Sequence, residues 1–481
     1  MTSAAEIPAE AAFQRESGEI RYVCMCSGDF SSSAKLAISD LASSKDRSCT
    51  SRSREPSLWT MSGRSGLVFG IVRAKQRTRN LRAIQGGREK YNGAMRDLVI
   101  VGSASENTFV EDIAHHLKQH EDYHDLISLK TFLNTEFCPR FIIDEQDTFK
   151  VGRKLEGKEV MIVSTSFSLL SRDELATRNF LIARAAKDNG ADRVILLEPD
   201  LFYSAQDRGP RPEHGFSDVR RDERDLKKFD GQAFSARLYA DLLTASGVDE
   251  VVTVDVHSES VRRIFLDRFS GRFHDLRPAE LYADYLNDSD IVRLDRLLLC
   301  SPDQGANDCV TSVQSRIRGG EVPVLFLEKK RDSERQVALK IADESGFSTD
   351  LIRGREVVII DDMVRTGNTI VETCKLIKRY EPHRILFLVT HFCSSREVRN
   401  NLNNPIIDEI VTTSSIPTIL NRDMQGRLRH KMVVLRVSRW IAAYIQHLHD
   451  PDEERLSKPL YKEDMSSKNP RWRGTMGPLF A

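Results

Sequence analysis

Two adjacent carboxylates, Asp361 and Asp362, directly follow an unbroken β-branched run at residues 357–360. Such a run is typical of a strand that is buried on both faces of a parallel sheet. The short loop that comes next contains Gly367 and precedes a helical pattern of apolar residues. Backbone N–H groups in such a loop favour a phosphate, and paired carboxylates suit ribose hydroxyls or hydrated Mg²⁺. The segment therefore predicts a sugar-phosphate site at the carboxyl edge of a sheet.

His257 and Asp303 each follow another predicted strand. His257 comes two residues after Asp255, and it could ligate Mg²⁺ or hold a phosphate. Asp303 lies in the segment SPDQGA at residues 301–306, where an Asp and a Gly just past a buried strand suit contact with a metal and a phosphate. Taken singly, such a histidine is more often a structural hydrogen-bonding group, and the segment around Asp303 also reads as an ordinary turn.

Cationic and amide groups follow two further strands. The segment EKKR at residues 328–331 could neutralise charge on a transferring phosphoryl group, although most charge runs are solvated loops. The segment QDR at residues 206–208 could hydrogen-bond a nucleotide or be an ordinary polar loop. Together these segments place polar groups at the carboxyl ends of successive strands, which is how a catalytic crevice is built in α/β proteins.

The elements that must position these groups alternate between strands and helices from residue 95 onward. Helical patterns include residues 173–188 and 233–246. Alternation of this kind predicts α/β architecture with parallel sheets, and about nine strands are many for one sheet, so two similar domains that divide near residue 260 fit better. The predicted strands are residues 98–101, 160–164, 194–197, 251–254, 297–300, 324–327, 357–360, 385–389 and 409–412.

Composition is that of an ordinary soluble protein of 481 residues, with 40% hydrophobic and 30% charged residues. Lys and Arg together number 71, as do Asp and Glu, so no global field points to nucleic acid or a membrane surface. No apolar run approaches the length of a membrane span. The eight cysteines are scattered, which favours reduced, buried thiols over a metal site.

Three segments differ from this alternating pattern. Residues 1–94 are rich in serine and basic residues without sustained periodicity, which indicates a disordered or non-core extension. An organelle transit peptide is an alternative, opposed by the early glutamates, and a natural start at Met95 is a third possibility. Residues 209–230 are dense in charge with almost no aliphatic residues, which predicts an exposed insertion, and residues 437–481 predict a C-terminal helix with an extended or loosely docked tail.

The whole series of motifs, in its order, resembles the ribose-phosphate diphosphokinase (PRPP synthase) family over roughly residues 96–447. The motifs that carry the resemblance are LFYSAQDR, the segment ending in VTVDVHSES, SPDQGA, EKKR, IDDMVRTGNT, VTH and NNLNNPIIDEIVTTSSIP. The resemblance implies two tandem phosphoribosyltransferase-like domains of doubly wound, mostly parallel sheet, at residues 95–260 and 261–436. It also implies a reaction of ATP with ribose 5-phosphate that gives PRPP and AMP, in a cytoplasmic homo-oligomer without nucleic-acid or membrane partners.

The resemblance also assigns roles to residues by their position in the motifs. Ribose 5-phosphate would be held by residues of the IDDMVRTGNT motif, namely Asp361, Asp362, Arg365, Thr366, Gly367, Asn368 and Thr369. Mg²⁺ would be held by His257 and Asp303. ATP would contact Gln206, Asp207, Arg208 and His257, together with Asp144 in a loop lent across a subunit interface. The transferring diphosphoryl group would be stabilised by Lys329 and Arg331.

Several positions depart from the family's pattern. Ala205 stands where the family usually has an arginine, Arg365 where it has an aspartate, and Ala306 where it has a second glycine, while Asn368 replaces a common Gly or Ala. The insertion at 209–230 is a further departure. An active, divergent enzyme explains these differences, and so does a regulatory subunit that binds without turnover. A phosphoribosyltransferase that consumes PRPP fits less well, since it leaves the DVH and EKKR segments without a purpose.

Overall fold

A computed structural model describes residues 11–16, 19–24, 98–105, 107–143, 149, 151–167, 169–217, 220–288, 290–333, 336–341, 349–449 and 457–472. Within these ranges the side chains are described too, except those of residues 11–24 and 329–341. The chain divides into two compact units, Met1–Glu89 and Lys90–Ala481. In the first unit, β1 (Ala11–Glu16) and β2 (Glu19–Cys24) form an antiparallel pair. The remainder of the predicted extension at 1–94 lies outside the described residues.

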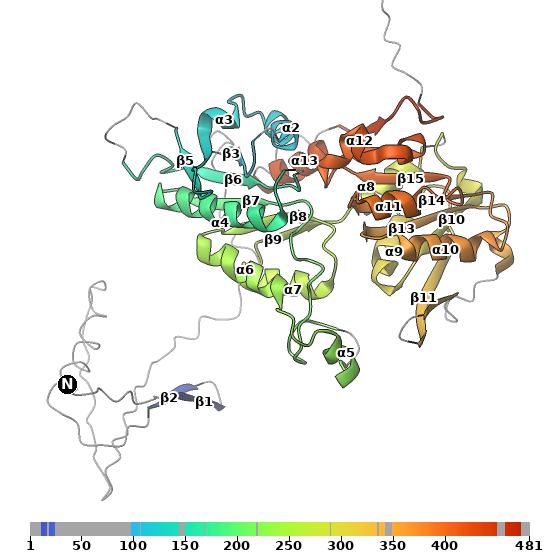
Figure 1. The fold of residues 1–481 in the computed structure, drawn as a ribbon, viewed down its shortest axis with the longest axis horizontal. Coiled ribbons are helices and arrows are strands. Elements are labelled where there is room, and N and C mark those ends of the chain that lie inside the picture. Colours follow the sequence, from blue (N-terminus) through green and yellow to red (C-terminus); the bar gives the residue numbers. More distant parts are fainter. Residues whose placement is uncertain are drawn as a thin grey trace, which may run out of the picture. The chain divides into compact units, whose positions relative to one another are not determined.

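The second unit begins with a five-stranded parallel sheet of order β3-β6-β7-β8-β9 (Figure 1). Its strands are β3 (Leu98–Gly102), β6 (Glu159–Val163), β7 (Arg193–Leu197), β8 (Glu250–Val254) and β9 (Phe273–Leu276). The accompanying elements are α2 (Thr108–His116), α3 (Tyr123–Leu126), the hairpin β4 (Ile127–Thr131) and β5 (Phe137–Phe141), α4 (Arg172–Asp188), α5 (Glu223–Lys228), α6 (Ser235–Ser246) and α7 (Glu259–Arg268). A capping box between Ser171 and Glu174 fixes the start of α4.

An eight-stranded sheet of order β12-β11-β10-β13-β14-β15-β16-β17 follows, and it is parallel from β11 to β16. Its strands are β10 (Leu297–Ser301), β11 (Val324–Ser333), β12 (Gln336–Ile341), β13 (Glu356–Val364), β14 (Arg384–Phe392), β15 (Glu409–Thr413), β16 (Met432–Arg436) and β17 (Lys462–Met465). The helices are α8 (Ala279–Leu286), α9 (Asn307–Gln314), α10 (Asn368–Lys378), α11 (Arg396–Leu402), α12 (Arg422–Gln425) and α13 (Ser438–His449).

The central strand β13 is buried on both faces, as its β-branched run predicts. Val357 and Ile359 join one apolar cluster, while Val358 and Ile360 join the cluster on the opposite face, and all four side chains are fully buried. Helices cover both sides of each sheet (Figure 1). The predicted α/β class with mostly parallel sheets is therefore confirmed, and no helix among the described residues is long and apolar enough to cross a bilayer.

The change from the first sheet to the second comes later in the chain than residue 260. That position lies within α7, and β9 after it still belongs to the five-stranded sheet, so the sheets change over between Leu276 and Leu297. The C-terminal helix α13 returns to the first sheet, where Trp440, Ile441 and Ile445 join its apolar core. The tail adds β17 as an antiparallel edge strand on β16 instead of lying loosely.

Candidate functional site

A crevice of about 1040 Å³ opens at the carboxyl ends of β8, β10 and β13. Residues 255–260 line it from the first half of the unit, and residues 303–306 and 361–367 line it from the second half. The sequence-predicted residues in its wall are Arg208, His257, Asp303, Asp361, Asp362, Arg365, Thr366, Gly367 and Thr369. Gln206, Asp207 and Asn368 are described but are not in the wall.

The loop that precedes α10 has the backbone geometry of a ligand-binding turn. Gly367 is the N-cap of α10 with φ 79°, a left-handed conformation that favours glycine. The side-chain amide of Asn401 donates to the backbone oxygen of Thr366 at 2.8 Å and to Oδ1 of Asn368 at 2.9 Å, so α11 holds the loop in place. This arrangement leaves backbone N–H groups at a helix N-terminus facing the crevice, where a phosphate would be favoured.

The acidic pair is poised for a cation. Burial, together with the neighbouring carboxylates of Asp362 and Asp303, raises the pKa of Asp361 well above its usual value. Burial alone would raise the pKa of Asp362 too, but a hydrogen bond and the charge of His257 lower it. Carboxylate oxygens gathered so that they repel one another fit Mg²⁺, which prefers oxygen ligands and shares them with substrate phosphates. Among the described residues, no group of three His, Cys, Asp or Glu side chains forms a complete metal site.

His257 joins the two halves directly across the crevice. Its Nδ1 lies 2.6 Å from Oδ2 of Asp362. Burial lowers the pKa of His257, but the hydrogen bond to Asp362 and the charge of that carboxylate outweigh burial and raise the pKa above its usual value. Behind it, the buried Asp255 accepts a hydrogen bond from Oγ1 of Thr390 at 2.5 Å, and burial raises the pKa of Asp255 to about 6. His391 Nε2 lies 3.0 Å from the backbone oxygen of Val254. The VTH segment therefore connects β14 to β8 instead of facing the crevice.

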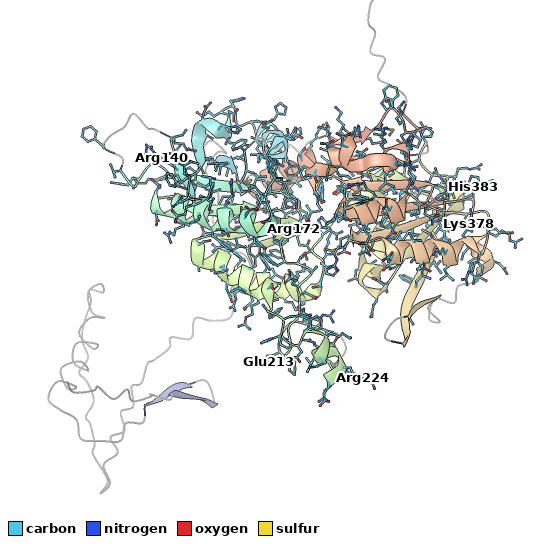
Figure 2. The ribbon with its side chains drawn as sticks, in the orientation of Figure 1. Arg140, Arg172, Glu213, Arg224, Lys378 and His383 are labelled. Carbon is cyan, nitrogen blue, oxygen red and sulfur yellow. The ribbon has the colours of Figure 1, made fainter. Side chains whose placement is uncertain are left out.

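A second interdomain contact lies beside this network. Arg172, at the start of α4 where the two halves meet, pairs with the buried Asp200 (Figure 2). Its guanidinium NH2 also lies 4.0 Å from Sγ of Cys393, which follows β14. Arg172 therefore contacts residues of both halves, although it does not line the crevice.

Comparisons with known proteins agree with the motif order. A family model described as a phosphoribosyl transferase domain matches residues 280–414. A ribose-phosphate pyrophosphokinase of Marinomonas sp. is 25% identical over 276 residues, which cover 57% of this chain and 76% of that protein. Ribose-phosphate pyrophosphokinase 2 of Saccharomyces cerevisiae is 22% identical over 312 residues, which cover 64% and 84%. The chain is thus similar to ribose-phosphate pyrophosphokinases over more than half of its length.

A solved structure shares the fold of this chain. The phosphoribosylpyrophosphate synthetase from Mycobacterium smegmatis superposes with a TM-score of 0.57 at 20% identity, and the match covers 74% of this chain and all of that one. At this level of identity the likeness concerns the fold. It agrees with the two sheets and with the crevice at their carboxyl ends.

The predicted catalytic cations lie on a strand, which corrects the expectation of a loop after residue 327. Strand β11 continues to Ser333 and pairs antiparallel with β12, so that Lys329 lies opposite Leu339 and Arg331 opposite Val337. The reason is that residues 336–341 provide a partner strand, which extends the pairing beyond the apolar run. The side chains of Lys329 and Arg331, and all of Asp144, lie outside the described residues.

Part of the crevice wall is formed by residues that no sequence motif had identified. Phe216 and Ser217 come from the insertion, and Arg262 and Arg277 come from α7 and the segment after β9. Figure 2 shows Glu213 and Arg224 of the same insertion, and both side chains are exposed. Only the tertiary fold brings Phe216 to the crevice, since the surrounding residues, PRPEHGFSDVRR, follow no strand and form no recognisable motif.

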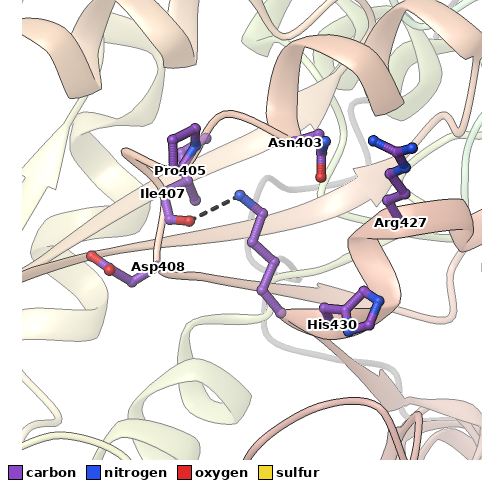
Figure 3. Close-up of a pocket in the computed structure, with 7 residues that line it drawn as sticks. Asn403, Pro405, Ile407, Asp408, Arg427 and His430 are labelled. Atoms are coloured by element: carbon purple, nitrogen blue, oxygen red, sulfur yellow. Dashed lines mark hydrogen bonds between the residues drawn. The ribbon is translucent and has the colours of Figure 1, made fainter.

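A smaller pocket of about 410 Å³ lies among the loops that precede β15 and β16 (Figure 3). Lys431 donates from Nζ to the backbone oxygens of Asn404 and Ile407 at 2.8 and 2.9 Å, and burial lowers its pKa to about 8. Because the pocket is at the amino ends of these strands, it faces away from the carboxyl edge where the predicted residues gather. Its lysine is satisfied by carbonyl groups, which is a structural role.

Proposed function

We propose that the chain is a ribose-phosphate diphosphokinase that transfers the β,γ-diphosphoryl group of Mg-ATP to the C1 hydroxyl of ribose 5-phosphate. The observation that carries this proposal is the convergence, in one crevice, of the loop around Gly367, the pair Asp361–Asp362 and His257 from the opposite half. A crevice of about 1040 Å³ has room for a sugar phosphate and a nucleotide together. The similarity to ribose-phosphate pyrophosphokinases supports the same reaction.

The ribose 5-phosphate would bind along β13 and the start of α10. Backbone N–H groups around Gly367 would hold the 5-phosphate, and Asp361 and Asp362 would accept hydrogen bonds from the ribose hydroxyls. Arg365 and Thr366 line the same part of the crevice and would add donors to the phosphate. Because Asp362 pairs with His257 in the structure, ribose binding would compete with that pair.

The nucleotide would enter from the opposite wall. Arg208 lines the crevice, with Gln206 and Asp207 immediately before it, and Asp144 would come from a neighbouring subunit of a homo-oligomer. His257 and Asp303 would hold Mg²⁺, which when bound neutralises charge on the ATP phosphates.

In the reaction, the C1 oxygen forms a bond to the β-phosphorus, the bond from that phosphorus to the α,β-bridging oxygen breaks, and AMP leaves. The C1 hydroxyl loses its proton to solvent or a nearby base. Lys329 and Arg331 would stabilise the charge on the transferring group, so that positioning and charge neutralisation carry most of the rate.

A regulatory subunit that binds these ligands without turnover is the second candidate. Two features favour it, namely Ala205 in place of the family's usual arginine and the insertion at 209–230. A phosphoribosyltransferase is less well supported, since it would need neither His257 nor Lys329.

The deciding experiment measures AMP formation by purified protein with ATP, ribose 5-phosphate and Mg²⁺, with and without inorganic phosphate. AMP and PRPP in equal amounts would support the diphosphokinase. Binding of ribose 5-phosphate by calorimetry without AMP formation would support the regulatory subunit. If the protein neither forms AMP nor binds ribose 5-phosphate, both candidate functions are contradicted.

A further inference from the structure

Four ionisable side chains form a row across the first sheet, at the amino ends of its strands. In a parallel sheet, register partners share a face and every second residue of a strand returns to that face. The register of β6, β7, β8 and β9 therefore places all four side chains on the same face. From one strand to the next they are Glu159, Arg193, Glu250 and His274. This edge of the sheet is opposite to the carboxyl edge that lines the crevice.

Arg193 joins the two carboxylates of this row. Its NH2 donates to Oε2 of Glu159 at 2.8 Å, and its NH1 donates to Oε2 of Glu250 at 3.0 Å. The side chain of Glu250 is only 6% exposed, so its charge is largely removed from water. A single guanidinium can neutralise only one of two carboxylates, so the row is balanced only by a second positive charge.

The C-terminal helix α13 brings that charge to the row through its last residue, His449. The helix packs beside α2 and on the core of the first sheet (Figure 1), and the side chain of His449 is 7% exposed. Its Nδ1 lies 2.9 Å from the backbone oxygen of Ile445, and its Nε2 lies 3.0 Å from Oε2 of Glu159. A carbonyl oxygen and a carboxylate can only accept, so the geometry favours a proton on both ring nitrogens.

The electrostatics of His449 agree with this geometry. Burial lowers the pKa of His449, but the hydrogen bonds to Glu159 and to the backbone of Ile445 outweigh burial and raise the pKa above its usual value. Arg193 opposes the imidazolium, since its NH2 lies 3.2 Å from Nε2 of His449. The carboxylate of Glu159 therefore decides the charge of the ring.

The other histidine of the row, His274, is satisfied in either protonation state. Its Nε2 lies 3.1 Å from Oε1 of Glu250, and its Nδ1 lies 3.0 Å from the hydroxyl oxygen of Tyr444 on α13. The proton on Nε2 is donated to the carboxylate. A hydroxyl group can donate to a bare Nδ1 or accept from a protonated one, so this contact persists when the ring gains or loses a proton. Of the two histidines, only His449 has a contact with α13 docked that depends on its charge.

We propose that the contact of His449 with Glu159 is a proton-dependent latch, which fastens the end of the C-terminal helix to the first sheet and loosens as pH rises. Because α13 follows β16 of the second sheet, the latch ties the second half of the unit to the first. When His449 is protonated, two cations balance the two carboxylates, and loss of the proton leaves one negative charge unbalanced. Since the pKa of His449 is raised in the folded state, the stabilisation is complete below the ordinary value of 6.5 and is lost as pH rises through the higher value.

The carboxylates of the row keep their charge across this pH range. Burial raises the pKa of Glu159 and of Glu250, but hydrogen bonds to His449 and to His274, with the charge of Arg193, lower both pKa values below the usual value. Both side chains are therefore ionised at neutral pH and above. Their protonation does not contribute to the expected change.

The groups that surround the rest of α13 also keep their charge. On α2, burial and the neighbouring charge of His115 lower the pKa of His116, whose backbone oxygen accepts from the side chain of Gln446 at 3.4 Å. The ring of His116 is therefore neutral above pH 6.5, and the charges that face it are Asp112 and Arg439. Burial raises the pKa of Tyr444, so its hydroxyl group keeps its proton.

The test measures amide hydrogen exchange in the last two turns of α13 on the full chain, at about pH 6 and about pH 8.5, with intrinsic exchange rates corrected. Local exchange is the suitable measure, because the buried Glu198 changes global stability over the same range. Protection in the wild-type protein should fall about fivefold or more at the higher pH, since hydrogen bonds to charged groups contribute on that order. His449→Gln keeps a polar side chain that cannot take a proton, so its protection should be the same at both pH values.

His447→Gln is the matched control, since His447 is an exposed histidine of the same helix, and it should show the wild-type fall in protection. Glu159→Gln separates the latch from the general preference for a cation at a helix C-terminus, and it should abolish the fall. The proposal is overturned if wild-type protection does not change with pH, or if either His449→Gln or Glu159→Gln keeps the wild-type fall.

A second measurement applies if a variant does not fold. Deuterium exchange at the ring carbon between the two nitrogens of His449, followed in the wild-type protein over a series of pH values, gives the midpoint at which this ring titrates. A midpoint above 6.5 supports the latch. A midpoint at or below 6.5 overturns it, because the contact with Glu159 would then not favour the proton.

Discussion

Replacing Gly367 with alanine tests the loop that is proposed to hold the sugar phosphate. The residue has φ +79°, and a left-handed backbone costs a residue with a Cβ about 1–2 kcal/mol. The new methyl group would lie 3.1 Å from Cδ2 and 3.2 Å from Cγ of Leu402, a fully buried side chain with little room to move. Crowding of this kind adds about 1 kcal/mol or more.

The protein can relieve this strain by moving the loop, which would displace the backbone N–H groups around Thr366 and Asn368. We therefore expect Gly367→Ala to weaken ribose 5-phosphate binding by about 5- to 30-fold, the ratio that corresponds to 1–2 kcal/mol. The affinity for ATP should change little, because the nucleotide is assigned to the opposite wall. Calorimetric titration of each ligand separately measures both effects.

Gly354→Ala is the control for the backbone cost alone. Gly354 has φ +69°, an added Cβ would meet nothing within 4 Å, and the residue precedes β13 at the end away from the crevice. It should lose a comparable 1–2 kcal/mol of stability by denaturant unfolding and bind ribose 5-phosphate normally. The assignment of the phosphate loop is refuted if folded Gly367→Ala binds ribose 5-phosphate as tightly as the Gly354 variant.

Three further predictions address the catalytic cation, a buried acid and the N-terminal segment. Lys329→Ala should stay folded and lose turnover by about 100-fold or more, since one transition-state donor contributes ~3 kcal/mol; kinetics within a few-fold of wild type would exclude that role. Burial raises the pKa of Glu198 to about 8, so the folded state keeps its proton while the unfolded state loses it, and stability should fall as pH rises from about 4.5 to 8. Glu198→Gln should flatten that fall in melting temperature, and an unchanged slope would contradict the assignment. Deleting residues 1–94 should leave activity and folding intact, and an insoluble truncated protein would show that the segment belongs to the core.

Nine strands could be predicted because parallel strands that are buried on both faces leave a continuous apolar run. All nine predicted segments overlap β3, β6, β7, β8, β10, β11, β13, β14 and β15. The interior strand β16 was missed although four of its five residues are buried, whereas the edge strands β9 and β17 carry a weaker signal. In β9 only Phe273 and Leu276 are buried, and β17 (Lys462–Met465) has no fully buried residue, as is typical of edge strands. Such strands are defined by a neighbour's backbone rather than by their own side chains.

The site could be predicted only as separate groups. Each polar motif follows one of the predicted strand segments, so its presence at the carboxyl edge was predictable from the chain, although β11 and β13 extend through two of these motifs in the structure. The pairing of His257 with Asp362 joins residues 105 positions apart and depends on how the two halves meet, which no local pattern encodes. The same holds for Thr390 and Asp255, whose buried hydrogen bond links β14 to the end of β8.

The insertion bears directly on the choice between an active enzyme and a regulatory subunit. In the sequence it interrupts the nucleotide region and, with Ala205, favours lost activity. In the fold, the insertion packs against Asp207 through Gly215 and places Asp225 and Phe229 around Arg208. The insertion therefore supports the guanidinium of Arg208 instead of displacing it. A segment that had only lost a function would have no physical need for a glycine at that contact or for a buried Arg221. The insertion therefore favours a nucleotide site that has been rebuilt. We expect Arg221→Ala to make the insertion less ordered and, as a result, to weaken the affinity for ATP.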